Sequence, residues 1–419
     1  NLGHALVSEK RYEEAVMQYR QAIKINPYYS KAHNNLGHAL SELKRYDEAI
    51  EHYQQAIKIK SNFAEAYNNL ANAMRQKGKI KESIAYYNEA IRFKSNYAEA
   101  YSNLGITLSE QGRFEEAIGQ YQKALESNPD LFRVHNSLAI QLAQRGDFVG
   151  AISHYQQAIT FDSGFAKAHN NLGNTLTQLG RLEEAVIHFQ KAIQINPNNA
   201  NEHNNLGNTL KDLGEFDEAL ASYRKAIQMR PKFAEAHSNL GNLCSDLQRL
   251  DEAFDHIQKA ITLRPDFADA HNNLGVVLQK LGRLEESVDS FHKAIAINPD
   301  YADAHNNLAG TLKELGWLED SVDSYQKAID INPELADAHN NLGNALKDLG
   351  QFSKAKAAYD RGFHINHGGP WYNAATFADG DGAGMGLPTG KVSTSTFKLR
   401  DTIDQLEYLI AKGRIDPSF

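Results

Sequence analysis

Apolar residues recur along the chain at the spacing of amphipathic α-helices, and the helices come in pairs. In one unit the pattern predicts a first helix over residues 32 to about 43 and a second over residues 47 to about 59. Each helix has one apolar face, and we expect the opposite face of the first helix, which carries Asn34 and Asn35, to meet solvent. A short basic or glycine-containing turn separates the two helices, so the unit is a helical hairpin.

The hairpin repeats along most of the chain with a period of 34 residues. Many periods end at a proline that cannot continue the helical hydrogen-bond ladder, as at Pro27 and Pro129. A fixed spacing of this kind is typical of stacked repeats rather than of a compact globular domain. We place the repeat starts, each marked by Asn-Leu-Gly or a near variant, at residues 1, 35, 69, 103, 137, 171, 205, 239, 273, 307 and 341.

The end of the chain departs from this pattern. We expect the repeats to occupy residues 1–369 and an irregular linker, rich in Gly, Thr and Ser, to follow at residues 370–396. Helical spacing returns in residues 397–412, which we predict to be one amphipathic C-terminal helix before a short tail at residues 413–419. Because Asn1 enters a helical pattern directly, we expect the chain to be a fragment of a longer protein.

The unit resembles the tetratricopeptide repeat, in which Leu-Gly in the first helix, Ala and Tyr in the second and a terminal Pro recur at this period. Leu36, Gly37, Ala49 and Tyr53 carry the resemblance in one unit, and Pro129 ends another. The resemblance implies an all-α fold, a superhelical solenoid of about eleven hairpins whose first helices line the concave side.

Composition and charge exclude several classes of partner. The chain has 419 residues with 52 acidic and 44 basic side chains, so it lacks the positive field that draws in nucleic acid or anionic lipid. A single cysteine cannot form an internal disulfide, and no long apolar run marks a membrane span. We therefore expect a protein of the cytoplasm or nucleus with no cofactor, no nucleic-acid partner and no membrane partner.

The histidines invite a catalytic or metal-binding interpretation, but their positions favour packing. Eight of the 17 occupy one repeat position, where Tyr67 and Tyr101 stand in two other units. A metal site needs several converging ligands, not one ring per repeat. Cys244 occupies a core position held by Leu elsewhere, and no nucleophile–base or paired-carboxylate arrangement is visible, so we predict a non-catalytic chain. The eight histidines are His33, His135, His169, His203, His237, His271, His305 and His339.

Two columns of asparagine run along the first helices. Asn is a mediocre helix former, so its return at solvent positions needs another reason. The first column, broken only by Ser137, consists of Asn35, Asn69, Asn103, Asn171, Asn205, Asn239, Asn273, Asn307 and Asn341. The second column, one residue earlier, consists of Asn34, Asn68, Ser102, Asn136, Asn170, Asn204, Ser238, Asn272, Asn306 and Asn340.

An amide side chain can bond both the C=O and the N–H of an extended peptide without regard to the peptide's side chains. If neighbouring first helices lie ~10 Å apart, one amide arrives about every three residues of a strand that rises ~3.3 Å per residue. We therefore assign peptide binding to the first column. The alternatives are that the asparagines tie each repeat to the next through hydrogen bonds, or that they record recent duplication of one unit.

The columns are interrupted near Ser137. Ile106 and Ile140 occupy a position that holds His38, Asn72 or Asn174 in other units. We predict a local apolar patch in the groove that anchors a ligand side chain.

The run Ala-His-Asn-Asn-Leu-Gly-Asn, as at residues 168–174, resembles the tetratricopeptide region of the O-linked N-acetylglucosamine transferases. The resemblance implies an asparagine ladder that holds substrate peptides by their backbone, and it extends to the first column only. The transferase activity does not carry over, because only 50 residues follow residue 369.

These observations together predict a non-catalytic scaffold that captures extended polypeptide along an asparagine-lined groove. We expect it to serve as the substrate-recruiting arm of a larger glycosyltransferase-like protein. The alternative is a structural protein that self-associates, its superhelices assembling into an oligomer or filament.

Overall fold

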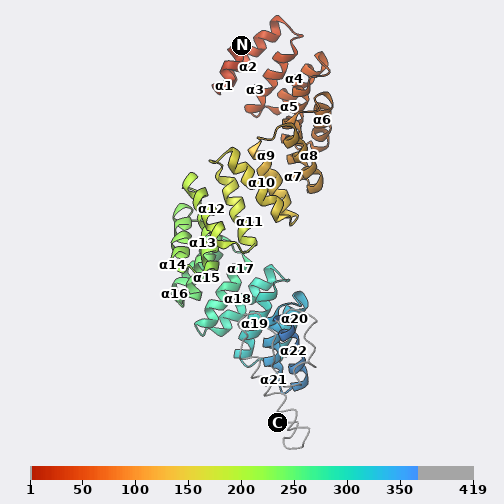
Figure 1. Ribbon diagram of the computed structural model, residues 1–419. Coiled ribbons are helices and arrows are strands. Elements are labelled where there is room, and N and C mark those ends of the chain that lie inside the picture. Colours follow the sequence, from red (N-terminus) through yellow and green to blue (C-terminus); the bar gives the residue numbers. More distant parts are fainter. Residues whose placement is uncertain (1, 367–419) are drawn as a thin grey trace, which may run out of the picture. The chain divides into compact units, whose positions relative to one another are not determined.

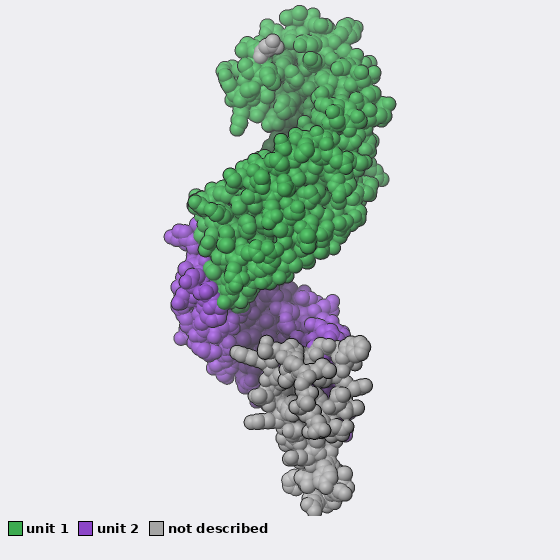
Figure 2. Space-filling view, in the orientation of Figure 1, with its two compact units in different colours: residues 1–213 green, residues 214–419 purple. Residues whose placement is uncertain are grey.

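The computed structural model describes residues 2–366 of the chain. Among these residues the secondary structure consists of 22 α-helices and no strands, which confirms the predicted all-α fold (Figure 1). The chain divides into two compact units, residues 1–213 and residues 214–419 (Figure 2). The predicted linker, C-terminal helix and tail lie outside the described residues.

The first unit consists of six consecutive hairpins and one further helix. Odd-numbered helices, here called A helices, are the first of each pair, and even-numbered helices are called B helices. The bounds are α1 Leu2–Ser8, α2 Tyr12–Ile25, α3 Ser30–Glu42, α4 Tyr46–Ile59, α5 Ala64–Gln76, α6 Ile80–Phe93, α7 Ala98–Glu110, α8 Phe114–Ser127, α9 Phe132–Gln144, α10 Phe148–Phe161, α11 Ala166–Gln178, α12 Leu182–Ile195 and α13 Ala200–Leu213.

The second unit begins with one B helix and continues with four hairpins. Its bounds are α14 Phe216–Met229, α15 Ala234–Asp246, α16 Leu250–Leu263, α17 Ala268–Lys280, α18 Leu284–Ile297, α19 Ala302–Glu314, α20 Leu318–Ile331, α21 Ala336–Asp348 and α22 Phe352–Asn366. The helices predicted at residues 32–43 and 47–59 agree with α3 and α4 to within two residues.

Each hairpin shares its core with its neighbours. Within a unit, an A helix packs against its own B helix, against the preceding B helix and against the next A helix, as α5 does with α6, α4 and α7. The fully buried side chains Leu36, Leu40 and Tyr53 belong to one cluster with Leu6 and Leu70 of the adjacent hairpins. Burying such a side chain contributes about 1.5–3 kcal/mol, so a hairpin without neighbours would lose much of its stabilisation.

The turn between the A and B helices requires one residue in the left-handed region. Glycine supplies it at eight turns, for example at Gly180 with φ 71° and Gly282 with φ 73°. Lys10, Lys44 and Gln248 adopt φ 60° at the same position. A residue with a Cβ is strained in this conformation by roughly 1 kcal/mol, because the Cβ approaches the following carbonyl oxygen.

Replacing Gln248 with glycine is therefore expected to stabilise the α15–α16 hairpin by about 1 kcal/mol. Hydrogen exchange of the amides in α15 and α16 measures the change. The matched control is Gly282→Ala in the next hairpin, which should reduce protection by a similar amount. Equal protection in the Gln248→Gly variant and the wild type would show that the left-handed turn carries no strain.

Candidate functional site

The first column lies along the row of A helices, and every member is half-buried. Within each unit, its amide nitrogen donates to the second-column residue of the preceding repeat. These bonds are Asn69 to Asn34 (3.1 Å), Asn103 to Asn68 (3.1 Å), Asn171 to Asn136 (3.0 Å), Asn205 to Asn170 (3.2 Å), Asn273 to Ser238 (3.3 Å), Asn307 to Asn272 (3.1 Å) and Asn341 to Asn306 (3.4 Å). The inter-repeat hydrogen bonds that the sequence left as an alternative are therefore present.

The expectation that the second column meets solvent is wrong for six of its ten members, which are buried, while the other four are half-buried. Asn34, Asn68 and Asn136 are 8%, 0% and 3% exposed, and Ser238 is also buried. The physical reason is that this side of an A helix is covered by the next A helix of the stack, which a view of one isolated helix does not include. A buried amide oxygen needs a donor, and the first-column residue of the next repeat supplies it.

The first column keeps hydrogen-bonding capacity after making this bond. An asparagine amide has two N–H donors and one oxygen with two lone pairs. Asn69 and Asn103 each use one donor in the inter-repeat bond, and within the described residues nothing donates to their Oδ1 atoms. Each therefore presents an oriented donor and acceptor at the surface of the A-helix row. Asn35 on α3 and Asn239 on α15 occupy the same half-buried position.

The columns are interrupted between α7 and α9. Ser137 donates its hydroxyl to the carbonyl of Arg133 in its own helix, at 3.0 Å. Its counterpart in the second column is Ser102, so two serines replace both asparagines of one inter-repeat pair. Ile106 on α7 and Ile140 on α9 are half-buried beside this break.

Comparison with protein families identifies the repeat. A family model described as TPR repeat matches residues 3–44, 37–75, 173–214, 207–245, 241–282 and 311–350. Models described as tetratricopeptide repeat match residues 62–130, 102–164, 154–187, 268–301, 291–323 and 336–366. The chain belongs to the tetratricopeptide-repeat family. No match to a curated protein was found, so the resemblance to the transferases rests on the sequence run alone.

Solved structures of similar fold include YrrB, described as a TPR protein with an unusual peptide-binding site. It is 27% identical, with a TM-score of 0.37 over 44% of this chain and 95% of that chain. Yeast Tom70 is 14% identical, with a TM-score of 0.49 over 99% of this chain and 96% of that chain. Cut9–Hcn1 of the APC/C is 12% identical, with a TM-score of 0.46 over 87% and 92%.

The histidines of the A helices occupy packing positions, as predicted. Seven of the eight are buried, and His203 is half-buried. In most of these repeats the ring donates through Nε2 to a proline carbonyl six residues earlier, as from His135 to Pro129 at 2.9 Å. Such a donor to a backbone carbonyl fixes the neutral tautomer and leaves Nδ1 as an acceptor.

Sequence reasoning missed a second set of histidines on the B helices. Four A-helix histidines approach a B-helix histidine, with the two Nδ1 atoms 2.9–3.2 Å apart. The sequence does contain a signal for these pairs: in each of the four repeats a second histidine follows the A-helix histidine by 19 residues. Tyr67 and Tyr86 form the equivalent ring contact in another repeat. The pairs are His33–His52, His135–His154, His169–His188 and His237–His256.

Burial lowers the pKa of histidines in these pairs. For His169 burial and the nearby His188 lower the pKa from 6.5 to about 4. Burial also lowers the pKa of His52, His154 and His256, and a neighbouring histidine adds to the effect for the first two. A second proton between two facing Nδ1 atoms would remove the hydrogen bond and place a positive charge in a partly buried contact.

The free energy of unfolding should therefore depend on pH. A group whose pKa is lower in the folded state contributes its full stability above its unfolded value of 6.5, and this contribution is lost as the pH falls toward the folded pKa. We expect the unfolding temperature to fall between about pH 7 and pH 5. The B-helix histidines can be replaced by serine, which occupies the same position at 290 and 324. A quadruple variant at His52, His154, His188 and His256 should show a flatter profile, and an identical profile would contradict this origin.

Three other candidate features are a reactive thiol, a metal position and a membrane-spanning helix. Cys244 is buried, and burial raises the pKa of its thiol to about 11, which keeps the thiol protonated and unreactive at neutral pH. Over residues 2–366 no group of three or more His, Cys, Asp or Glu side chains converges on a possible metal position. None of the helices in the described part of the chain is long and apolar enough to cross a membrane.

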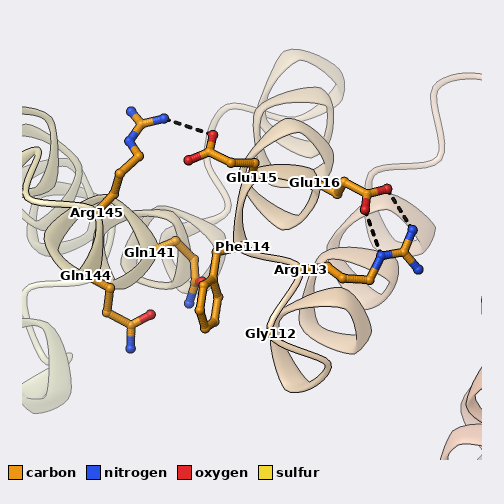
Figure 3. A pocket seen from close by; sticks show the side chains of 8 residues that line it. All are labelled: Gly112, Arg113, Phe114, Glu115, Glu116, Gln141, Gln144 and Arg145. Carbon is orange, nitrogen blue, oxygen red and sulfur yellow. Dashed lines mark hydrogen bonds and ion pairs between the residues drawn. The ribbon is translucent and has the colours of Figure 1, made fainter.

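A pocket of about 390 Å³ lies between the start of α8 and the end of α9 (Figure 3). Its charged side chains are already paired: Arg113 donates to both oxygens of Glu116, and Arg145 donates to Glu115 at 3.1 Å. Gln141 also lines the pocket, is 5% exposed, and its Oε1 has no hydrogen-bond partner within the described residues.

Replacing Gln141 with leucine should stabilise the α9–α10 hairpin. Leu243 holds the same repeat position and is fully buried, so the fold accepts this side chain. Removing an unpaired buried amide is expected to raise the free energy of unfolding by about 1–3 kcal/mol. Hydrogen exchange in α9 measures the change. Gln144→Leu, at an exposed residue of the same pocket, is the control and should have little effect, whereas destabilisation by Gln141→Leu would mean that the amide is satisfied by bound water.

Proposed function

We propose that the chain is a non-catalytic protein-interaction scaffold that holds extended polypeptide by its backbone along the first column of asparagines. The observation that carries this proposal is the difference in burial and hydrogen bonding between the two columns. The second column accepts the inter-repeat bonds and six of its ten members are buried, whereas the first column is half-buried, and its members Asn69 and Asn103 each keep a donor and an acceptor.

The inter-repeat bond supports binding rather than competing with it. A free asparagine side chain would lose rotamer entropy when it captured a peptide. An amide already held by Asn34 or Asn68 has lost most of that freedom on folding. The column therefore presents prealigned groups whose binding cost is low. The amides recur once per A helix, and this spacing suits about three residues of an extended strand.

We propose that Ile106 and Ile140 add an apolar contact where the column is interrupted. Both are half-buried, and the two serines beside them offer less hydrogen bonding than asparagines would. A peptide crossing this break would gain affinity from an apolar side chain in place of a backbone bond.

The resemblance to the transferases supports a more specific role, in which the solenoid recruits substrates for a larger glycosyltransferase-like protein. The second candidate, self-association, is favoured by exposed apolar side chains at the end of α2, where Ile25 and Tyr28 are 84% and 81% exposed. A cytoplasmic or nuclear location remains part of the proposal.

The variants Asn103→Ala and Asn68→Ala test the assignment, because both remove the same inter-repeat bond, and Asn68→Ala also removes the bond from Asn68 to Glu99. Both should destabilise the α5–α7 region by about 1 kcal/mol or more. Only Asn103→Ala should weaken peptide binding, by roughly five-fold for a lost pair of backbone bonds.

The probes are peptides enriched on the wild-type protein from a displayed random library, and fluorescence anisotropy gives their dissociation constants. Stability of both variants is followed by hydrogen exchange in α5 and α7. Equal weakening by the two variants, or none by Asn103→Ala, would assign the column to stability alone.

A further inference from the structure

The repeat that contains α13 departs from the other repeats at two packing positions. Glu202 stands where the other repeats place alanine, or valine at Val134, and it is 3% exposed. Asn199 stands where every other repeat has Phe, Tyr or Leu, including the buried Phe63 and Phe233. Two apolar packing residues have thus been replaced by a carboxylate and a smaller amide.

The two replacements contact each other and border a cavity. Asn199 donates its amide to Oε1 of Glu202 at 3.0 Å. Both line a pocket of about 450 Å³ between α11 and the start of α13, where a smaller side chain has taken the place of an aromatic ring. The pocket is also lined by Asn170 and Asn171, one residue from each column, so it opens beside the proposed peptide-binding row.

One oxygen of the buried carboxylate is unsatisfied. Oε2 of Glu202 is buried and has no hydrogen-bond partner within the described residues. Lys167 lines the same pocket and is exposed, but none of the ion pairs in the described part of the chain joins it to Glu202. Burial raises the pKa of Glu202, as expected for a carboxylate without a cation. No cation in the described part of the chain therefore pairs with this carboxylate.

We propose that the pocket at Glu202 binds the ammonium group of a lysine side chain in the captured polypeptide. This inference rests on the proposed function, because it adds a selective position to a row that otherwise bonds only backbone. The ammonium pairs with Oε2 and donates its other protons to amide oxygens among Asn170, Asn171 and Asn196.

The geometry favours ammonium over other cations. A guanidinium group prefers two carboxylate oxygens side by side, and Oε1 of Glu202 is already occupied by Asn199. A calcium ion needs six to eight oxygen ligands, and the pocket offers one carboxylate. A compact point charge with three donors matches one free carboxylate oxygen surrounded by amides.

The first test uses small probes that do not depend on the row of asparagines. N-acetyl-lysine N-methylamide and its norleucine analogue are titrated into the isotope-labelled chain, and the side-chain amide resonance of Asn199 is followed by NMR. We expect the lysine probe to bind roughly ten-fold or more tightly than the norleucine probe, and the arginine analogue to bind less tightly than lysine. Equal binding of lysine and norleucine, no detectable binding of lysine, or a preference for arginine would overturn the proposal.

Three variants complete the test. Glu202→Gln keeps the shape and the bond from Asn199 but removes the charge, and it should abolish the lysine preference. Glu202→Ala restores the residue of the other repeats, so we expect it to fold, to gain stability and to lose the same preference. Lys167→Met removes a charge from the same pocket without touching the carboxylate, and lysine binding should be kept or strengthened. A preference that survives in both Glu202 variants, or a loss in Lys167→Met as large as in Glu202→Gln, would overturn the assignment.

The two proposals fail separately. Loss of lysine selectivity in these probes leaves backbone capture by the first column unaffected, because that is measured with Asn103→Ala and Asn68→Ala. Conversely, unchanged peptide affinity in Asn103→Ala would contradict backbone binding by the first column, but it would not contradict the ammonium site.

Discussion

The close approach of the A helix to a large apolar side chain of its own B helix, an aromatic ring in most hairpins, is the constraint on which the rest of the structure depends. A Cβ added to Gly37 would lie 2.7 Å from the ring of Tyr53, and one added to Gly275 would lie 2.6 Å from Phe291. Such distances are inside van der Waals contact, so the glycine sets how near the two helices come. Three repeats place alanine here, and no described hairpin places anything larger. The hairpins therefore share the same separation between their two helices, and stacking them repeats the same offset between neighbouring A helices.

That uniform offset allows single-residue columns to become continuous features. A hydrogen bond tolerates only a few tenths of an ångström in length, and the inter-repeat bonds stay within 3.0–3.4 Å across both units. The same bonds hold the first-column amides in place before any ligand arrives. The residues that keep the repeats in register are thus also those that present regularly spaced polar groups to the surface, which links the stability of the stack to its proposed capacity to bind.

The sequence predicted the fold well because the fold depends on periodic features. Helix limits, the hairpin turn and the packing role of the A-helix histidines all follow from one unit viewed by itself. The errors and omissions concern side chains whose burial or pairing is set by a neighbouring helix. Asn34 was expected to be exposed, but the next A helix of the stack covers it. The pairing of His33 with His52 depends on how an A helix and a B helix cross, which the sequence of one helix does not show. Glu202 was overlooked because a count of repeat positions finds what recurs, whereas this side chain occurs once.

In a repeat protein, departures from the common residue carry different information from the residues that recur. A recurring residue is explained by the stack, since every unit must meet the same neighbours. A single departure usually strains the packing and needs a compensating change close by. Ser102 with Ser137 and Asn199 with Glu202 are compensated pairs of this kind, each occurring once along the described chain. The first pair only removes a bond, but the second introduces a charge that the protein leaves half-satisfied. Because packing alone gives no reason to bury an unpaired carboxylate, its position beside Asn171 favours a role in recognising a cation.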